Sequence, residues 1–191
     1  MENITHLTWT EESRKQVFDC KIFTIWESYC KPPAINQDDE KPQTFSVIEA
    51  KDWAIVVPVI GKQFVMVRQW RHASQCLSLE FPGGVFEPGE NAEEAAAREL
   101  FEETGYKPRN IKKIGEFSPN PAIMCNKVHF FLAENLQGDG KQKLDDNEFV
   151  DAALIDIDEV SRNMGRAPYI HALMGTALML YHQERNRCPT A

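Results

Sequence analysis

The chain has 191 residues, 42% of them hydrophobic and 26% charged, which suits one domain, or one domain with an appended subdomain, around a hydrophobic core. Its formal net charge of −8 argues against binding to nucleic acid polymers or anionic membranes, because their phosphates are held mainly by Lys and Arg. We expect a soluble, cytoplasmic protein, since no apolar run could span a bilayer, no signal peptide is expected, and the five cysteines show no CxxC spacing.

Residues 1–50 are expected to form a small β-strand subdomain. Residues 15–30 and 43–50 are rich in aromatic and β-branched residues, and each segment predicts one strand. Residues 31–42 between them are Pro-rich and charged, which is typical of a loop. Because two strands alone are marginally stable in water, they should pack on the main body or on a second subunit.

Residues 51–191 are expected to form the main domain. Two aliphatic strands, at residues 53–60 and 63–70, flank a Gly-Lys pair that suits a tight hairpin. A further strand begins at residue 76 and runs into a Gly-Gly turn. The later strands are expected at residues 112–117, 127–135 and 151–157.

Two helices are expected in this domain. For the first, Asn91 is a good N-cap, Glu94 completes a capping box, and Gly105 is placed to end the helix in a left-handed cap. The second covers residues 167–185 and should bury a stripe made of Ile170, Leu173, Ala177 and Leu180. Mixed strands with one central and one terminal helix predict an α/β sandwich.

The first helix carries an unusual concentration of carboxylates. At about 100° per residue, Glu103 lies about 40° and Glu102 about 60° from Glu99, so the three share one face. A Glu-rich helix is usually a solvated face, but such a face normally includes Lys or Arg, and here Arg98 is the only base between residues 90 and 105. Crowded like charges raise each other's pKa unless a cation lies among them, and Mg²⁺ or Mn²⁺ prefers oxygen ligands. The pattern favours a metal site.

The residues around this helix follow a known family motif. Gly84, five residues, Glu90, seven residues and then RELFEETGY at residues 98–106 match the whole Nudix box, and only Tyr106 is unusual, where an aliphatic residue is the norm. The chain therefore resembles the Nudix hydrolases from about residue 50 to its C-terminus. The resemblance implies an α/β/α sandwich with a mixed sheet. It also implies hydrolysis, with Mg²⁺ or Mn²⁺ as cofactor, of a nucleoside diphosphate linked to another group.

The resemblance implies a role for each residue of the box. The metal ligands would be the backbone carbonyl of Gly83 and the side chains of Glu99, Glu102 and Glu103. Of these, Glu102 and Glu103 would also be catalytic. Arg98 would orient the glutamates, and Glu90 would support the geometry of the loop and helix. The residues that support the site would be Gly84, Glu90, Arg98 and Gly105.

Outside the box, the chain is similar to one branch of the family, the ADP-ribose pyrophosphatases. Residues 65–84 resemble the strand and loop that precede the box in that branch, including Arg71 and Glu80. Pro121, fifteen residues after Tyr106, is a further mark of the branch, although a loop Pro is usually only a turn device. A guanidinium matches phosphate oxygens bidentately, so Arg68 and Arg71 are candidate phosphate clamps, with a surface salt bridge as the alternative. The expected substrate-binding residues are Arg68, Arg71, Glu80 and Pro121.

The acidic loop near residue 148 is expected to supply the group that holds or deprotonates the attacking water. Glu148 is the first candidate by position in the branch, and Asp145, Asp146 and Asp151 are alternatives; a merely solvated loop is the other interpretation. His129 and His171 fall in apolar segments, where a satisfied core histidine is the commoner case. Aromatic residues that could stack on adenine, although core packing is expected for each, are Phe45, Trp53 and Trp70.

The sequence favours hydrolysis of ADP-ribose to AMP and ribose 5-phosphate, and two other functions stay open. One is a Nudix pyrophosphohydrolase for nucleotide sugars, dinucleoside polyphosphates or nucleoside triphosphates. The other is a nucleotide-binding module without catalysis, which an intact box disfavours. The expected partner is a nucleoside diphosphate-linked small molecule, and the branch uses its N-terminal strands to form a homodimer.

Overall fold

The computed structural model describes residues 5–33, 41–146 and 148–187. It contains two compact units. The first comprises Met1–Lys51 and Ser118–Asn126, and the second comprises Asp52–Phe117 and Lys127–Ala191. None of the helices within the described residues is both long and apolar enough to cross a membrane.

The first unit holds a short 3₁₀ helix, η1 (Thr5–Leu7), and an antiparallel sheet in the order β1 (Thr10–Asp19), β2 (Phe23–Lys31) and β3 (Gln43–Ala50). The sequence predicts two strands here, so that prediction is wrong by one strand. The chain reverses at Cys20, whose N–H donates to the carbonyl of Phe23 at 3.0 Å, and this turn splits the expected first strand. Most of the expected loop lies outside the described residues. Every residue of β1 is exposed within this chain.

The second unit is built around a mixed sheet. Its main path runs β10 (Val150–Asp156), β5 (Gln63–Arg71), β4 (Trp53–Ile60), β9 (Val128–Gly138) and β8 (Tyr106–Phe117). Two short strands join it, β6 (Cys76–Glu80) beside β5 and β7 (Gly83–Val85) beside β4. The pairing of β4 with β9 is parallel and the other pairings are antiparallel.

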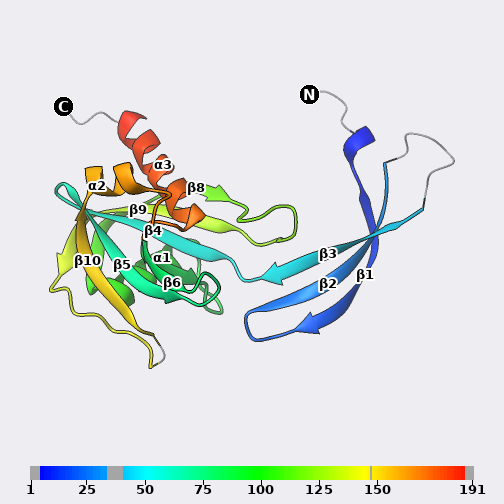
Figure 1. The fold of residues 1–191 in the computed structure, drawn as a ribbon, viewed down its shortest axis with the longest axis horizontal. Helices are drawn as coiled ribbons and strands as arrows, with labels where there is room; N and C mark the ends of the chain where they lie inside the picture. The colour runs from blue at the N-terminus through cyan, green and yellow to red at the C-terminus, as the bar shows by residue number, and fades with distance from the viewer. Residues whose placement is uncertain (1–4, 34–40, 147, 188–191) are drawn as a thin grey trace. The chain divides into compact units, whose positions relative to one another are not determined.

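Helices cover both faces of this sheet (Figure 1). On one face, α1 (Ala92–Thr104) buries Ala95, Ala96 and Leu100 against Ala54 and Val56 of β4. On the other face, α2 (Ile157–Asn163) and α3 (Ala172–Arg187) close a larger apolar core. Alternate side chains of a strand point to opposite faces, so β4 supplies both cores. This α/β/α layering is the predicted architecture.

The ends of α1 follow the predicted pattern. The side-chain oxygen of Asn91 accepts from the N–H groups of Glu93 and Glu94, each at 3.0 Å, and the Glu94 carboxylate accepts from the Asn91 N–H at 2.9 Å. Gly105 ends the helix at φ 74° and donates to the carbonyl of Phe101. A Cβ at Gly105 would also meet the backbone of Lys141, so both the left-handed backbone and the close contact require glycine at this position.

The C-terminal region differs from its prediction. The last helix begins at Ala172 instead of residue 167, and Ile170, expected in its buried stripe, precedes it and is exposed. Ala177 and Leu180 are buried as expected. The chain before the helix forms turns at residues 164–168, and the ring of His171 caps α3 by accepting from the N–H of Leu173. The short helix α2, capped by Asp156, was not expected from the sequence.

Candidate active site

Two glycines of β7 bring the backbone up to the glutamates of α1. Gly83 pairs with Ile55 of β4, and its N–H donates to the carboxylate of Glu103 at 2.9 Å. A Cβ at Gly83 would overlap the carbonyl oxygen of Ala54. A Cβ at Gly84 would overlap the Glu99 carboxylate. The Gly-Gly pair is thus required by close approach, to backbone in one case and to a functional side chain in the other.

The inner face of α1 buries two of the three clustered glutamates. Glu99 is 9% exposed and Glu103 is 5% exposed, whereas Glu102 lies at the rim and is only half-buried. The neighbouring Ala95 and Ala96 are completely buried and let the helix lie close to the sheet. A carboxylate loses hydration when it is buried, so this arrangement is unfavourable unless positive charge compensates it.

Arg98 supplies part of that compensation by linking the glutamates to the loop before the helix. Its Nη1 donates to Glu99 at 2.9 Å and to Glu102 at 3.0 Å. Its Nε and Nη2 donate to Glu90 at 2.7 and 3.1 Å, and Nη2 also donates to the carbonyl of Val85. Glu90 in turn accepts from the backbone N–H of Glu87 at 2.9 Å.

Even with Arg98 in place, the inner carboxylates keep uncompensated charge. Burial raises the pKa of Glu99 to about 6, the charges of Glu102 and Glu148 add to this, and Arg98 acts against it. Burial likewise raises the pKa of Glu103 to about 8, with repulsion from Glu99 and Glu148 added and the Gly83 N–H opposing. Both effects favour the protonated acid unless a cation lies nearby.

The residues of this face fit a hard divalent ion by their chemistry. Carboxylate oxygens are the ligands that Mg²⁺ and Mn²⁺ prefer, and a bound cation removes the repulsion that raises these pKa values. Within the described residues, no three acidic, His or Cys side chains already converge as a complete metal site. The hydrogen bonds explain this, since Arg98 holds Glu99 and Glu102 while Gly83 holds one oxygen of Glu103.

A cavity of about 230 Å³ opens beside the two glycines. One of its walls is an ion pair in which Nε and Nη2 of Arg71 donate to the two oxygens of Glu80, at 2.7 and 2.5 Å. Burial raises the pKa of Glu80, but the hydrogen bonds and charge of Arg71 lower it by a larger amount, so the pKa lies below its ordinary value. The cavity is lined by Trp53, Ala54, Ile55, Arg71, Glu80, Phe81, Gly83, Gly84, Val85, His171, Leu173 and Met174.

The second predicted arginine does not share this wall. Arg68 lies three residues before Arg71 on β5, so the two side chains point to opposite faces of the strand, and Arg68 is not among the residues that line the cavity. Asp151, an alternative candidate for the base, is the cross-strand partner of Arg68 and therefore lies on the same face as Arg68. The structure brings Arg71 and Glu80 together at the cavity and separates Arg68 and Asp151 from it.

The acidic loop is tied to the C-terminal end of α1. The Gln142 side chain donates to the carbonyls of Glu103 and Val150, at 2.6 and 2.9 Å, and the Lys143 N–H donates to the carbonyl of Glu102 at 2.8 Å. No sequence pattern predicted these anchors, because they depend on which part of the fold the loop crosses.

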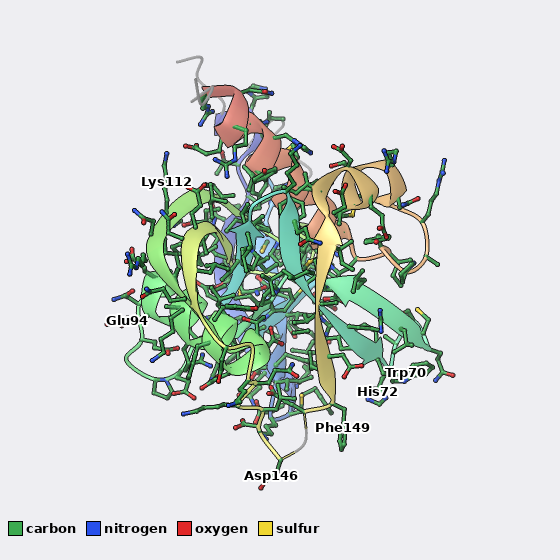
Figure 2. The ribbon with its side chains drawn as sticks, turned by 90° about the vertical axis from the view of Figure 1, so that its left-hand side faces the viewer. Trp70, His72, Glu94, Lys112, Asp146 and Phe149 are labelled. Carbon is green, nitrogen blue, oxygen red and sulfur yellow. The ribbon has the colours of Figure 1, made fainter. Side chains whose placement is uncertain are left out.

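Within this loop, Glu148 is the acidic residue whose charge acts on the inner carboxylates. It raises the pKa of both Glu99 and Glu103 while remaining exposed itself. Asp145 meets Glu148 locally, because its N–H donates to the Glu148 carboxylate at 3.2 Å. Asp146 lies at the outer tip of the loop and points away from the sheet (Figure 2).

The remaining candidates are scattered. Pro121 lies in a turn of the first unit, which also holds Phe45, whereas the other candidates lie in the second. Trp53 packs against the core, as expected for it, and it also lines the cavity. Trp70 is 48% exposed at the end of β5 (Figure 2) and Phe45 is 42% exposed, so neither has the core position expected for it.

The two histidines have different surroundings. His129 lies between acidic side chains, 3.3 Å from Asp52 and 3.3 Å from Glu116, but within the described residues its buried Nδ1 has no hydrogen-bond partner, so the expected satisfied histidine is met at Nε2 alone. His171 was expected in the apolar stripe of a helix, but it precedes α3 and lines the cavity. Its position could not be read from the apolar spacing, because that spacing does not mark where the helix begins.

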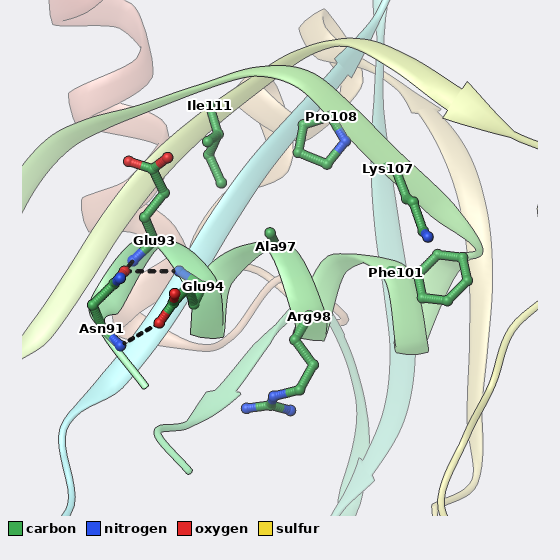
Figure 3. A pocket seen from close by; sticks show the side chains of 9 residues that line it. All are labelled: Asn91, Glu93, Glu94, Ala97, Arg98, Phe101, Lys107, Pro108 and Ile111. Atoms are coloured by element: carbon green, nitrogen blue, oxygen red, sulfur yellow. Dashed lines mark hydrogen bonds between the residues drawn. The ribbon is translucent and has the colours of Figure 1, made fainter. Parts of the chain in front are cut away.

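A larger hollow, about 670 Å³, lies on the outer side of α1 (Figure 3). Its floor is apolar, and the Lys107 ammonium lies 4.4 Å from the centre of the Phe101 ring. Asn91 and Glu94 at one end are occupied in capping the helix (Figure 3). The inner glutamates, Glu99 and Glu103, are not among its lining residues.

Comparison with known sequences agrees with this geometry. The family model of the NUDIX domain matches residues 50–173. An ADP-ribose pyrophosphatase of Bacillus subtilis (strain 168) is 30% identical over 149 residues, which cover 77% of this chain and 78% of that enzyme. A methanol dehydrogenase activator of Bacillus methanolicus is 32% identical over 107 residues, which cover 56% of this chain and 58% of that protein.

Comparison with solved structures supports the same fold. A crystal structure of an ADP compounds hydrolase superposes with a TM-score of 0.81, covering 94% of this chain and 95% of that one. The two chains are 18% identical, so this likeness establishes the fold alone. The predicted α/β architecture with a mixed sheet is confirmed.

Proposed function

The chain belongs to the Nudix family and is a pyrophosphohydrolase, and on this premise we propose that it hydrolyses ADP-ribose to AMP and ribose 5-phosphate with Mg²⁺ or Mn²⁺. The relative from Bacillus subtilis that carries the name ADP-ribose pyrophosphatase supports this choice of substrate. The observation that carries the proposal is the pair of buried carboxylates, Glu99 and Glu103, beside a cavity that could receive one end of such a substrate.

The site residues are proposed to act as follows. Glu99, Glu102 and Glu103, with the carbonyl of Gly83, would hold the metal. A divalent ion bound there supplies charge neutralisation for the pyrophosphate and lowers the pKa of bound water. Arg98 would hold Glu99 and Glu102 in place through the hydrogen bonds of its Nη1, and Glu90 would fix the other end of its guanidinium.

Glu148 is proposed to accept the proton of the attacking water. It is exposed, so its carboxylate is accessible, and its charge acts on Glu99 and Glu103. The anchoring of its loop on the carbonyls of Glu102 and Glu103 supports this role, because a general base must be held within reach of the water it deprotonates.

On the substrate side, Arg71 is proposed to contact a phosphate oxygen. Its Nε and Nη2 are used by Glu80, which fixes the plane of the guanidinium and leaves the Nη1 edge outside this pair. The fixed plane lowers the entropy lost on binding. Arg68 and Pro121 have no comparable support, because Arg68 does not line the cavity and Pro121 belongs to the first unit.

The N-terminal unit is proposed to form the contact of a homodimer. All of β1 is exposed within one chain, and apolar side chains such as Phe18 and Ile22 are exposed with it. Covering this surface would stabilise the sheet. Gel filtration tests the proposal: a mass near the 21.9 kDa of one chain would contradict it.

A substrate panel tests the proposed reaction. Purified protein is incubated with Mg²⁺ or Mn²⁺ and with ADP-ribose, ADP-glucose, a dinucleoside polyphosphate or a nucleoside triphosphate, and the products are separated by chromatography. The proposal expects AMP from ADP-ribose at the highest kcat/KM. Faster hydrolysis of another compound would make that compound the preferred substrate instead of ADP-ribose. Activity on none of them would contradict the proposal that the protein hydrolyses these compounds.

A further inference from the structure

His171 has a role in the cavity that its place in the sequence does not indicate. It is half-buried, directly precedes α3, and lines the cavity together with Arg71 and Glu80. Its Nδ1 accepts a hydrogen bond from the N–H of Leu173 at 3.2 Å, so the ring caps the first turn of the helix.

This hydrogen bond fixes which nitrogen carries the proton. A ring nitrogen that accepts a hydrogen bond has no proton of its own, so the single proton of a neutral imidazole must be on Nε2. Burial lowers the pKa of His171, the Arg71 charge lowers it further, and Glu80 only partly opposes them. The ring is therefore a neutral donor with a defined orientation.

The charges of the cavity indicate which part of a substrate it suits. The positive charge of Arg71 is balanced by its bidentate partner Glu80, and the His171 ring is neutral. The other walls are mostly apolar, including Trp53, Phe81, Leu173 and Met174. Apart from the proposed contact of the Arg71 Nη1 edge with a phosphate oxygen, the walls carry no net charge, and their apolar and aromatic surface suits a ring system with a few hydrogen-bond acceptors.

We infer that this cavity receives an uncharged ring of the substrate, a nucleobase or a sugar, and that His171 selects it by donating a hydrogen bond from Nε2 to a ring or hydroxyl acceptor. The inference rests on the proposed function and assigns a specificity-determining residue to it. A site built around one donor discriminates against compounds that lack the matching acceptor, because the donor would then be buried without a partner.

The test is His171→Asn, which keeps a side-chain oxygen to cap α3 but removes the Nε2 donor. Substrate pairs differ in one ring only: ADP-ribose against GDP-ribose for the base, and ADP-ribose against ADP-glucose for the sugar. We expect the variant to change the ratio of kcat/KM in one pair by about tenfold, the effect of losing one hydrogen bond, and to leave the other ratio unchanged. The affected pair identifies the ring. Unchanged ratios in both pairs would overturn the inference.

Control variants distinguish a change in substrate specificity from a defect in folding. His182→Asn removes an imidazole from α3 itself, where His182 meets Ser161 at 3.1 Å, and should leave both ratios unchanged. If His171→Asn is poorly folded, the same measurements are made on His171→Ser, which also keeps a capping oxygen and lacks the Nε2 donor.

A binding experiment keeps the inference independent of turnover. Isothermal titration with ADP-ribose in EDTA should show about tenfold weaker binding by His171→Asn than by the wild type, since one hydrogen bond is lost. Absence of hydrolysis by the wild type would contradict the proposed function but not this binding difference. Equal affinity, or no binding by either protein, would overturn the role of His171.

Discussion

The two sides of α1 carry the same type of residue in opposite circumstances. On the outer side, Glu94 is exposed, and its carboxylate accepts from the N–H of Asn91 to complete the capping box. On the inner side, Glu99 and Glu103 are buried, and their pKa values are raised to about 6 and about 8. Glu94 and Glu99 are only five residues apart in the same helix. What differs is the sheet and the glycine turn that cover the inner side.

The comparison teaches that cavity size and acidic content do not locate the chemistry. The outer hollow, about 670 Å³, is larger than the inner cavity of about 230 Å³, yet its Glu94 carboxylate completes the cap of the helix (Figure 3). The inner carboxylates are buried and lie close to one another, and both the loss of hydration and the repulsion are unfavourable for folding. Unfavourable burial of charge at a cavity is typical of a functional site.

The largest effect should come from Glu103→Gln. The amide keeps the shape of the side chain but removes its charge, so we expect kcat to fall about 1,000-fold, the scale of losing one electrostatic stabiliser. In EDTA the variant should unfold at the same temperature as the wild type or higher, because the amide is neutral without taking up the proton that Glu103 must bind on folding. Steady-state kinetics with Mg²⁺ and thermal unfolding measure the two effects. Near-normal turnover would contradict the proposal that Glu103 is a metal ligand.

A smaller effect is expected for Glu148→Gln. Loss of a general base should reduce kcat about 100-fold with little change in KM, since the residue is proposed to act on the water. Asp146→Asn is a matched control from the same loop, at its outer tip, and should retain full activity. If Glu148→Gln retains most of the turnover, another residue accepts the proton.

Gly84→Ala and Gly83→Ala compare two close approaches at the same turn. The Cβ at residue 84 would displace the Glu99 carboxylate, which can move, so we expect metal affinity to fall about 10- to 100-fold with little loss of stability. The Cβ at residue 83 would meet the Ala54 backbone, which cannot move easily, so the fold itself should be destabilised. Titration calorimetry with Mn²⁺ and thermal unfolding separate these outcomes, and identical behaviour of the two variants would contradict the distinction.

The pH dependence of stability tests the buried charge directly. Glu103 has its pKa raised to about 8, so the folded protein keeps a proton that the unfolded chain loses near its ordinary pKa. Stability should therefore fall as pH rises from about 6.5 to about 8.5, and the slope should vanish in Glu103→Gln. His171 has a lowered pKa and acts in the opposite direction only below about 6.5. Thermal unfolding in EDTA measures the slope; a rise in stability over this interval would contradict the assignment.

The smallest effect is expected on the outer side of α1. Asn91→Ala removes the acceptor for the N–H groups of Glu93 and Glu94, which should lower the free energy of unfolding by about 1 kcal/mol. Activity below the unfolding temperature should be unchanged, because the cap is not part of the inner face. Denaturant titration gives the free energy, and a loss of kcat without a loss of stability would place function on the outer side as well.

Much of the fold could be predicted because its signals are local. The capping box of α1 and the left-handed Gly105 follow from residues within one helix, and the strands 53–60 and 63–70 are marked by apolar runs around a turn. The extra N-terminal strand and the late start of α3 were missed. At Cys20 a strand-rich segment reverses without Gly or Pro, and before α3 an apolar pattern continues through turns.

The sequence alone determined the family, the acidic face of α1 and its ends, because the spacing of Gly84, Glu90 and the glutamates is a property of one continuous segment. Only the tertiary structure decided which carboxylates are buried, that Arg71 meets Glu80 while Arg68 faces away, and that His171 lines the same cavity. The physical reason is that burial and charge compensation depend on segments brought together from β5, β7 and α3, whose mutual positions no local spacing specifies.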